Sequence, residues 1–152
     1  MSAAAVPYLV AAVGTILIAI HSDRSRERRL HAAIPCLIAA LGFLGSALTH
    51  SPVVSLGVVT IAAVGIFGRS GPFWAMPTQL LTGRAAAGGI AFINTIGAVG
   101  GFVGPYAIGL VKRSTGRFAG GLSLLGLSLL AAGILTLLLG DRVQPRVVRQ
   151  AQ

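Results

Sequence analysis

This chain consists largely of long apolar blocks that contain no ionised side chain, and these blocks constrain its fold more than any other feature of the sequence. Each block holds on the order of 20 residues, which is what one helix needs to cross a bilayer core roughly 30 Å thick. Because that core offers no water to the backbone, each block must satisfy its own hydrogen bonds as a helix. The sequence therefore predicts an all-α, polytopic transmembrane helix bundle.

Composition agrees with a membrane protein and argues against a soluble one. Of the 152 residues, 55% are hydrophobic and only 10% are charged, with a mean hydropathy of +0.86. A soluble domain carries about 25% charged residues, which it needs to cover its surface. The net charge of +9 would suggest nucleic acid in a soluble protein. Here the basic residues stand between apolar blocks, so they indicate topology and contact with lipid headgroups, and we expect no nucleic-acid partner.

Five transmembrane segments are expected, at about 3–20, 32–48, 53–81, 85–111 and 118–139. The third contains Arg69, Gly71, Pro72 and Pro77, and proline interrupts a helix by removing a donor and clashing one turn back. We therefore expect this segment to be bent or partly unwound. Residues 1–140 form the bundle in this interpretation, and 141–152 form a polar tail.

The basic residues between the segments predict the orientation of the bundle. Five spans place the first loop, the third loop and the tail on one side, with eight arginines: Arg24, Arg26, Arg28, Arg29, Arg84, Arg142, Arg146 and Arg149. The other side holds three basic residues in the fourth loop: Lys112, Arg113 and Arg117. The positive-inside rule puts the richer side, with the C-terminus, in the cytoplasm.

The fourth segment is rich in glycine, and Asn94 lies at its middle. Gly97 and Gly101, like Gly100 and Gly104, are four residues apart, which places them on one face and lets another helix approach. A carboxamide at bilayer depth needs a partner. It either forms an interhelical hydrogen bond or points into a polar cavity, and the sequence leaves both open.

Arg69 is the unambiguous charge at membrane depth, where ionised side chains often mark functional sites. Structural explanations remain open, since carbonyls freed by the prolines, or snorkelling, would also accommodate the guanidinium. Trp74, which follows closely, lines a cavity or marks the membrane interface. The histidines, His21, His31 and His50, have no carboxylate or second histidine at ligand spacing, so we expect no metal site. Neither a catalytic set nor a cofactor motif is recognisable, and we expect no enzyme and no cofactor.

Several stretches resemble the major facilitator superfamily of transporters. SDRSRERR at 22–29 is similar to the cytoplasmic loop that this superfamily has between helices eight and nine. GPFWAMP at 71–77, GGIAFINTIG at 88–97 and GGFVGPY at 100–106 resemble helices ten and eleven of its anion–cation symporter branch, which includes tartrate, phthalate and sugar-acid transporters. Pro7 and Tyr8 also fit helix eight of that branch. The resemblance covers nearly the whole chain.

The resemblance implies a C-terminal fragment that carries helices eight to twelve of a secondary active, proton-coupled organic-anion symporter. It implies a multi-pass protein of the inner (plasma) membrane. Asn94, Ser70, Trp74 and Arg69 are then the expected substrate-binding residues, and they act only with the missing N-terminal half. The chain departs from the pattern at Ala98, where the family commonly has asparagine, and at Ala19 and Ile20, where a glycine is usual before the loop.

Other functions stay open beside transport. The chain is also interpretable as a small oligomeric membrane protein that does not transport, or as a degenerate gene product. A membrane enzyme ranks lowest, for want of catalytic residues. Expected partners are an organic anion in the presence of the missing half, membrane lipid, and either further copies of the chain or the remaining helices of the transporter.

Overall fold

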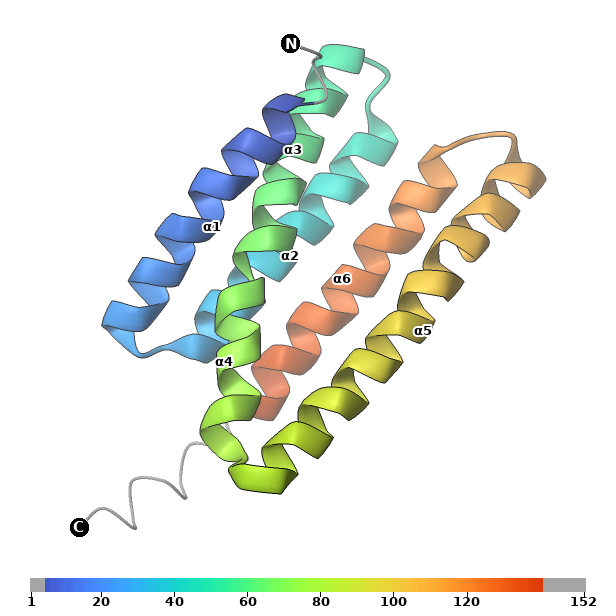
Figure 1. Ribbon diagram of the computed structural model, residues 1–152. Coiled ribbons are helices and arrows are strands. Elements are labelled where there is room, and N and C mark those ends of the chain that lie inside the picture. The colour runs from blue at the N-terminus through green and yellow to red at the C-terminus, as the bar shows by residue number, and fades with distance from the viewer. Residues whose placement is uncertain (1–4, 141–152) are drawn as a thin grey trace.

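The computed structural model describes residues 5–140 and places six helices among them (Figure 1). They are α1 (Ala5–Ser25), α2 (Arg28–Leu48), α3 (Pro52–Gly68), α4 (Ser70–Leu80), α5 (Gly83–Thr115) and α6 (Ala119–Gly140). Five helical stretches are long and apolar enough to cross a membrane, with α3 and α4 counting as one stretch from Pro52 to Gln79. The predicted all-α bundle with five spans is confirmed. The predicted tail at 141–152 lies outside the described residues.

The third span is interrupted at Arg69, between α3 and α4. The backbone N–H of Arg69 still donates to the carbonyl of Gly65, at 3.2 Å, so the break is slight. Pro72 lies in the first turn of α4, where its missing N–H costs nothing because the first donors of a helix have no partner inside it. The predicted interruption thus lies at Arg69, about one turn before Pro72, whereas Pro77 lies inside α4.

The helix ends follow local sequence signals. Ser51 caps α3 by accepting a hydrogen bond from the backbone N–H of Val54, at 3.5 Å, and Pro52 occupies the first turn. The left-handed φ of 67° at Gly116 ends α5, as glycine commonly does after a helix. The connection between α5 and α6 is therefore short, and the two helices run antiparallel as neighbours (Figure 1).

The core lies around α2, which packs against α3 on one side and α6 on another (Figure 1). Its contact positions are small: Ala33, Ala39 and Ala40 are fully buried, as is Ala62 on α3. Glycines lie on both sides of these contacts: Gly42 of α2 faces Ala62 of α3, and Gly133 of α6 faces Leu37 of α2. Small residues let helix backbones approach closely in a membrane, where dispersion and packing drive association.

The first loop is shorter than the sequence predicted. We expected a charged loop over residues 21–31, but α1 continues to Ser25 and α2 begins at Arg28. The two linking residues include Arg26, whose positive φ of 57° turns the chain sharply. Arg28 forms a salt bridge with Asp23 in this region and also donates to the hydroxyl of Ser22, at 3.4 Å.

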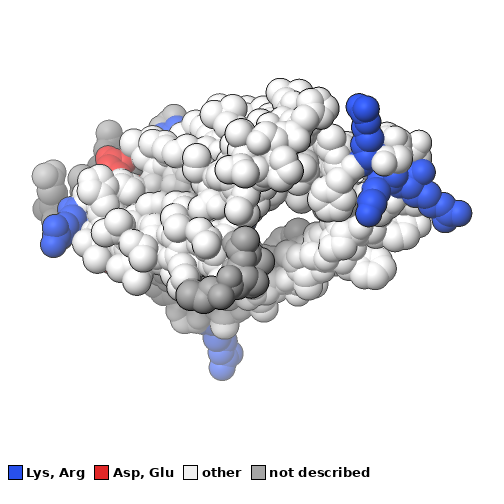
Figure 2. Space-filling model, turned by 90° about the horizontal axis from the view of Figure 1, so that it is seen from above, with Lys and Arg blue, Asp and Glu red and all other residues white. Residues whose placement is uncertain are grey.

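Helix α5 stands apart from this core. None of its residues is buried, and its contacts are to α6 and, more weakly, to α4. A Cβ added to Gly97, Gly100, Gly101 or Gly104 would meet nothing within 4 Å. The neighbour that we expected on this glycine face is therefore not among the described residues. Seen from the end of the bundle that carries the α5–α6 turn, the molecule is hollowed between its helices (Figure 2).

Candidate functional site

The start of α4 gathers a guanidinium and two aromatic rings. Arg69 lies with its guanidinium carbon 5.9 Å from the centroid of the Phe73 ring, one turn further along the helix. Phe73 in turn meets Trp74 edge to face, with ring centroids 5.4 Å apart. Such contacts hold both the cation and the rings in place. We call Arg69, Phe73 and Trp74 the α4 cluster.

Arg69 has unused hydrogen-bonding capacity in this cluster. Its Nε is buried and has no hydrogen-bond partner among residues 5–140. A buried polar group without a partner costs free energy, and a guanidinium offers five donors in a planar fork that matches a carboxylate. The guanidinium is therefore the group of the α4 cluster that matches an anion chemically, and the aromatic rings match the apolar part of a ligand.

Ser70 and Trp74, the predicted neighbours of Arg69, differ in what they offer. The Ser70 hydroxyl donates to the carbonyl of Ile66, at 3.4 Å, within the turn that joins α3 and α4. This bond ties Ser70 to the backbone, although its oxygen can still accept a hydrogen bond. Trp74 is 36% exposed, so part of its ring is open to whatever lies beside α4.

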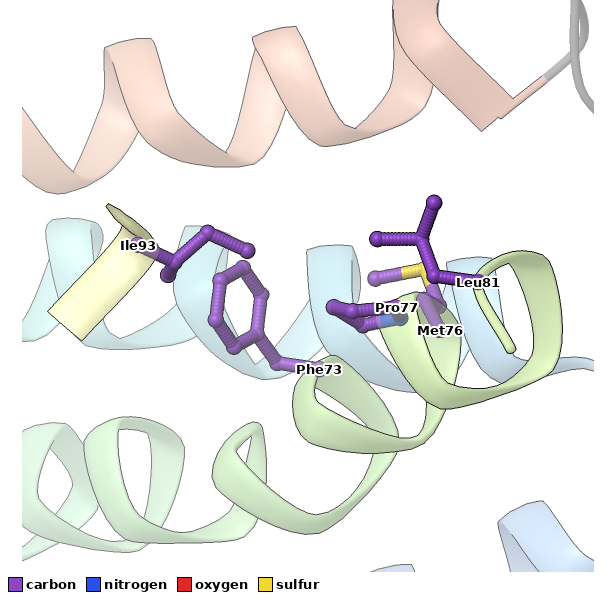
Figure 3. Close-up of a pocket in the computed structure, with 5 residues that line it drawn as sticks. All are labelled: Phe73, Met76, Pro77, Leu81 and Ile93. Carbon is purple, nitrogen blue, oxygen red and sulfur yellow. The ribbon is translucent and has the colours of Figure 1, made fainter. Parts of the chain in front are cut away.

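A pocket of about 300 Å³ lies between the C-terminal part of α4 and α5. Its lining is apolar: Phe73, Met76, Pro77, Leu81 and Ile93. Figure 3 shows Ile93 pointing from α5 toward the Phe73 ring, which connects the pocket to the α4 cluster. This lining could not be recognised in the sequence, because apolar residues in a membrane helix carry no pattern that separates a pocket wall from a lipid-facing surface.

Asn94 follows Ile93 on α5 but does not join the α4 cluster. Successive helical residues are rotated by about 100°, and the Asn94 side chain is exposed. No group among the described residues hydrogen-bonds to its carboxamide. The structure thus brings Arg69, Ser70 and Trp74 together on the α3–α4 segment and leaves Asn94 on the open side of α5.

One cluster of chemically active side chains escaped the sequence analysis. We expected no second histidine at ligand spacing, but the Nδ1 of His21 lies 2.5 Å from the Nε2 of His31. That expectation considered spacing along one segment, whereas these residues lie at the end of α1 and the start of α2. The shortness of the α1–α2 connection was the signal that could have identified the pair.

Comparison with known proteins identifies relatives among bacterial transporters. The chain is 48% identical over 144 residues to an Agrobacterium vitis protein named "Putative tartrate transporter", covering 95% of the chain and 32% of that protein. It is 37% identical to the quinolone resistance transporter of Acinetobacter baumannii, covering 86% of the chain and 30% of the relative. It is 46% identical to the inner membrane transport protein RhmT of Escherichia coli, covering 66% of the chain and 23% of the relative.

These relatives agree with the resemblance found in the sequence. The chain spans about a third of the length of two A. vitis relatives that it matches, which is consistent with a C-terminal part of a major facilitator transporter. No family model matches the chain, and no solved structure matches it. The chain is a multi-pass membrane protein homologous to transporters, and the predicted relationship is confirmed.

Proposed function

We propose that this homologue of bacterial transporters supplies part of the C-terminal half of a secondary active organic-anion symporter. The observation that carries the proposal is the 48% identity over 95% of the chain to a protein named as a tartrate transporter. Tartrate carries two carboxylates, and the α4 cluster offers a guanidinium with a buried, unpartnered Nε. We infer that transport, rather than catalysis, is the activity to which the chain contributes, and that protons drive it.

In this proposal Arg69 binds a carboxylate of the anion. The Phe73 ring lies beside the guanidinium, and Trp74 meets Phe73 edge to face, so both rings border the proposed site. A bidentate arginine–carboxylate pair is strong and fixes orientation. Ser70, the next residue, offers its hydroxyl oxygen to the same ligand as a hydrogen-bond acceptor.

We propose that Asn94 contacts the substrate separately from the α4 cluster, from the open face of α5. Its carboxamide is exposed and unpartnered in the described chain, and in a bilayer that arrangement is costly. An alternating-access carrier forms its substrate site between two bundles near the bilayer midplane. We propose that the open face of α5 borders such a shared site, with the remaining helices of the transporter on its other side.

The same open face supports a second candidate. A row of glycines at which an added Cβ meets no atom of residues 5–140 within 4 Å also suits pairing with α5 of another copy. In this alternative the chain is a small oligomeric membrane protein without transport activity. A degenerate gene product is the remaining alternative, and it predicts neither assembly nor uptake.

The proposed location is the bacterial inner membrane, with the α1–α2 connection and the C-terminus in the cytoplasm. The E. coli relative is named as an inner membrane protein. In Figure 1 the α1–α2 connection, the α4–α5 connection and the end of α6 lie at the same end of the bundle. Arginine is concentrated at this end of the bundle, as the positive-inside rule requires of the cytoplasmic side.

Uptake of radiolabelled tartrate into proteoliposomes under an imposed proton gradient tests the proposal. The purified 152-residue chain should give no uptake alone. Co-reconstituted with the N-terminal two-thirds of the A. vitis relative, it should give saturable uptake that a protonophore abolishes. Arg69→Gln should remove this uptake, whereas Arg113→Gln, in the last helical turn of α5 at the other end of the bundle, should not. Saturable, gradient-driven uptake by the chain alone would overturn the proposal and favour a homo-oligomeric carrier.

A further inference from the structure

His21 and His31 meet across the connection between α1 and α2. The Nδ1 of His21 is 2.5 Å from the Nε2 of His31, and the ring centroids are 4.7 Å apart with an angle of 47° between the planes. The His21 ring is exposed and the His31 ring is half-buried. Two imidazole nitrogens from different helices thus converge on one point at the surface of the bundle.

The backbone fixes which nitrogen of His31 carries its proton. The Nδ1 of His31 lies 2.7 Å from the carbonyl oxygen of Glu27, one turn earlier. A carbonyl can only accept, so Nδ1 of His31 is the donor, and in the neutral ring Nε2 then presents a lone pair. His21 must therefore donate from Nδ1 to that lone pair.

This arrangement matches the way proteins prepare a histidine for a metal ion. A metal-binding imidazole usually donates its second ring N–H to a carbonyl or carboxylate, which fixes the tautomer and the ring orientation. Glu27 supplies that carbonyl to His31. We propose that His21 and His31 form a binding site for a divalent transition-metal ion of the kind that prefers imidazole, such as Zn²⁺, Ni²⁺ or Cu²⁺.

Binding requires a small rearrangement of the free pair. The metal takes the place of the proton between the rings, and the proton of His21 moves from Nδ1 to the exposed Nε2, so the net charge of the two rings does not change. Two metal–nitrogen bonds of about 2.0–2.1 Å at a tetrahedral angle hold the nitrogens about 3.3 Å apart. The rings must therefore separate by somewhat under an ångström, which a rotation of the exposed His21 side chain provides.

The charges around the pair select against hard cations. Asp23 is already paired with Arg28, and Glu27 contributes its backbone carbonyl. The other charged residues of this region are basic: Arg24, Arg26 and Arg29. Mg²⁺ and Ca²⁺ prefer several anionic oxygen ligands, whereas this surface carries two carboxylates, of which Asp23 is paired with Arg28. The binding of a metal ion by neutral nitrogen atoms depends less on the charges nearby.

Water completes the coordination shell of the proposed ion. Among residues 5–140 no three His, Cys, Asp or Glu side chains form a metal-binding group.

Zn²⁺ titration of the full chain in detergent, purified through a tag without histidine, tests the site. With a chromophoric chelator as competitor, the parent should bind one Zn²⁺ per chain. His21→Ala and His31→Ala should each bind at least tenfold more weakly. His50→Ala is the matched control, because His50 is an exposed histidine at the other end of α2, and its affinity should stay within twofold of the parent. Lowering the pH should weaken binding, since protons compete for the same nitrogens.

Electron paramagnetic resonance of bound Cu²⁺ gives a readout that does not depend on folding of the variants. The parent should show two nitrogen ligands. A single nitrogen, or Zn²⁺ affinities within twofold for the parent and both histidine variants, would overturn the proposal and leave a hydrogen-bonded pair only. Equal loss in His50→Ala would overturn it as well. These measurements are independent of uptake, so they stand or fall separately from the transport proposal.

Discussion

Gly65 of α3 lies directly against the backbone carbonyl of Pro35 in α2, so closely that a Cβ at position 65 would overlap the carbonyl oxygen. That Cβ would also stand 2.9 Å from the Cβ of Ala39. Backbone cannot move aside as the end of a flexible side chain can. The close approach of α2 and α3 therefore depends on glycine at this position.

Gly65→Ala should destabilise the chain by about 1–3 kcal/mol, the usual cost of forcing bulk into a packed interface. Gly100→Ala is the matched control, because nothing lies within 4 Å of its added Cβ. It should be neutral or slightly stabilising, since alanine is the better helix former by about 0.5–1 kcal/mol. Thermal unfolding in detergent, followed by circular dichroism, measures both. Equal melting temperatures for the two variants would contradict this account of the α2–α3 interface.

The contrast between these glycines shows where sequence reasoning succeeds and where it stops. The transmembrane spans could be predicted from the length of each apolar block, because every block lies in the bilayer wherever it packs in the fold. The four-residue spacing of Gly97 and Gly101 does not distinguish a helix face that is packed from one that is open. What decides between them is which helices lie nearby, and that depends on residues such as Ala39 and Ala62, far away in the sequence.

Cys36 should be protected from thiol reagents in the folded chain. It is buried between α2 and α6, and its Sγ donates to the carbonyl of Leu129, at 3.2 Å. A membrane-permeant maleimide should label it at least tenfold more slowly in mild detergent than after denaturation in dodecyl sulfate. Rapid labelling without denaturation would show that α6 does not stay against α2.

The orientation of the bundle can be read from cysteines at its two ends. In a Cys36→Ala background, cysteines at Ser25 and Gln150 should resist an impermeant thiol reagent in intact cells, because we predict that both are cytoplasmic. Gln150 lies outside the described residues, whereas Ser25 ends α1. A cysteine at Ser114, at the opposite end, serves as the positive control and should react. Labelling of Ser25 and Gln150 from outside would reverse the topology.

Arg29 should stabilise the packing of α6 on α2. Its guanidinium donates to the carbonyl of Leu137 near the end of α6, 108 positions away. Cations at a helix C-terminus also interact favourably with its dipole. Arg29→Gln should lower the free energy of unfolding by about 1–2 kcal/mol, since hydrogen bonds to charged groups contribute somewhat more than neutral ones. Arg24→Gln, an exposed arginine on α1, should have little effect. If the two variants unfold alike, the contact with Leu137 does not contribute.

The candidate site could be predicted only in part. Arg69 and Trp74 were identifiable because charge and aromatic rings beside helix breakers are unusual at membrane depth. Their connection through Phe73 was not, since it depends on side-chain rotation around the start of α4. The histidine pair was missed because its members belong to different helices, and no periodicity within either helix relates them.

Asn94 should matter for transport and not for the stability of the chain. Its exposed carboxamide contacts no hydrogen-bonding group among residues 5–140, so Asn94→Ala should change the unfolding free energy by less than about 0.5 kcal/mol. In the co-reconstituted transporter, the same variant should weaken tartrate binding by about 1–2 kcal/mol, the range for a lost hydrogen bond. Thr95→Ala is the control, because that hydroxyl donates to the carbonyl of Ala91 in its own helix, at 2.9 Å. Equilibrium binding of radiolabelled tartrate to both variants separates the effects. Unchanged affinity in Asn94→Ala would remove this residue from the site and leave Arg69 as its anion ligand, with α5 acting as a packing surface alone.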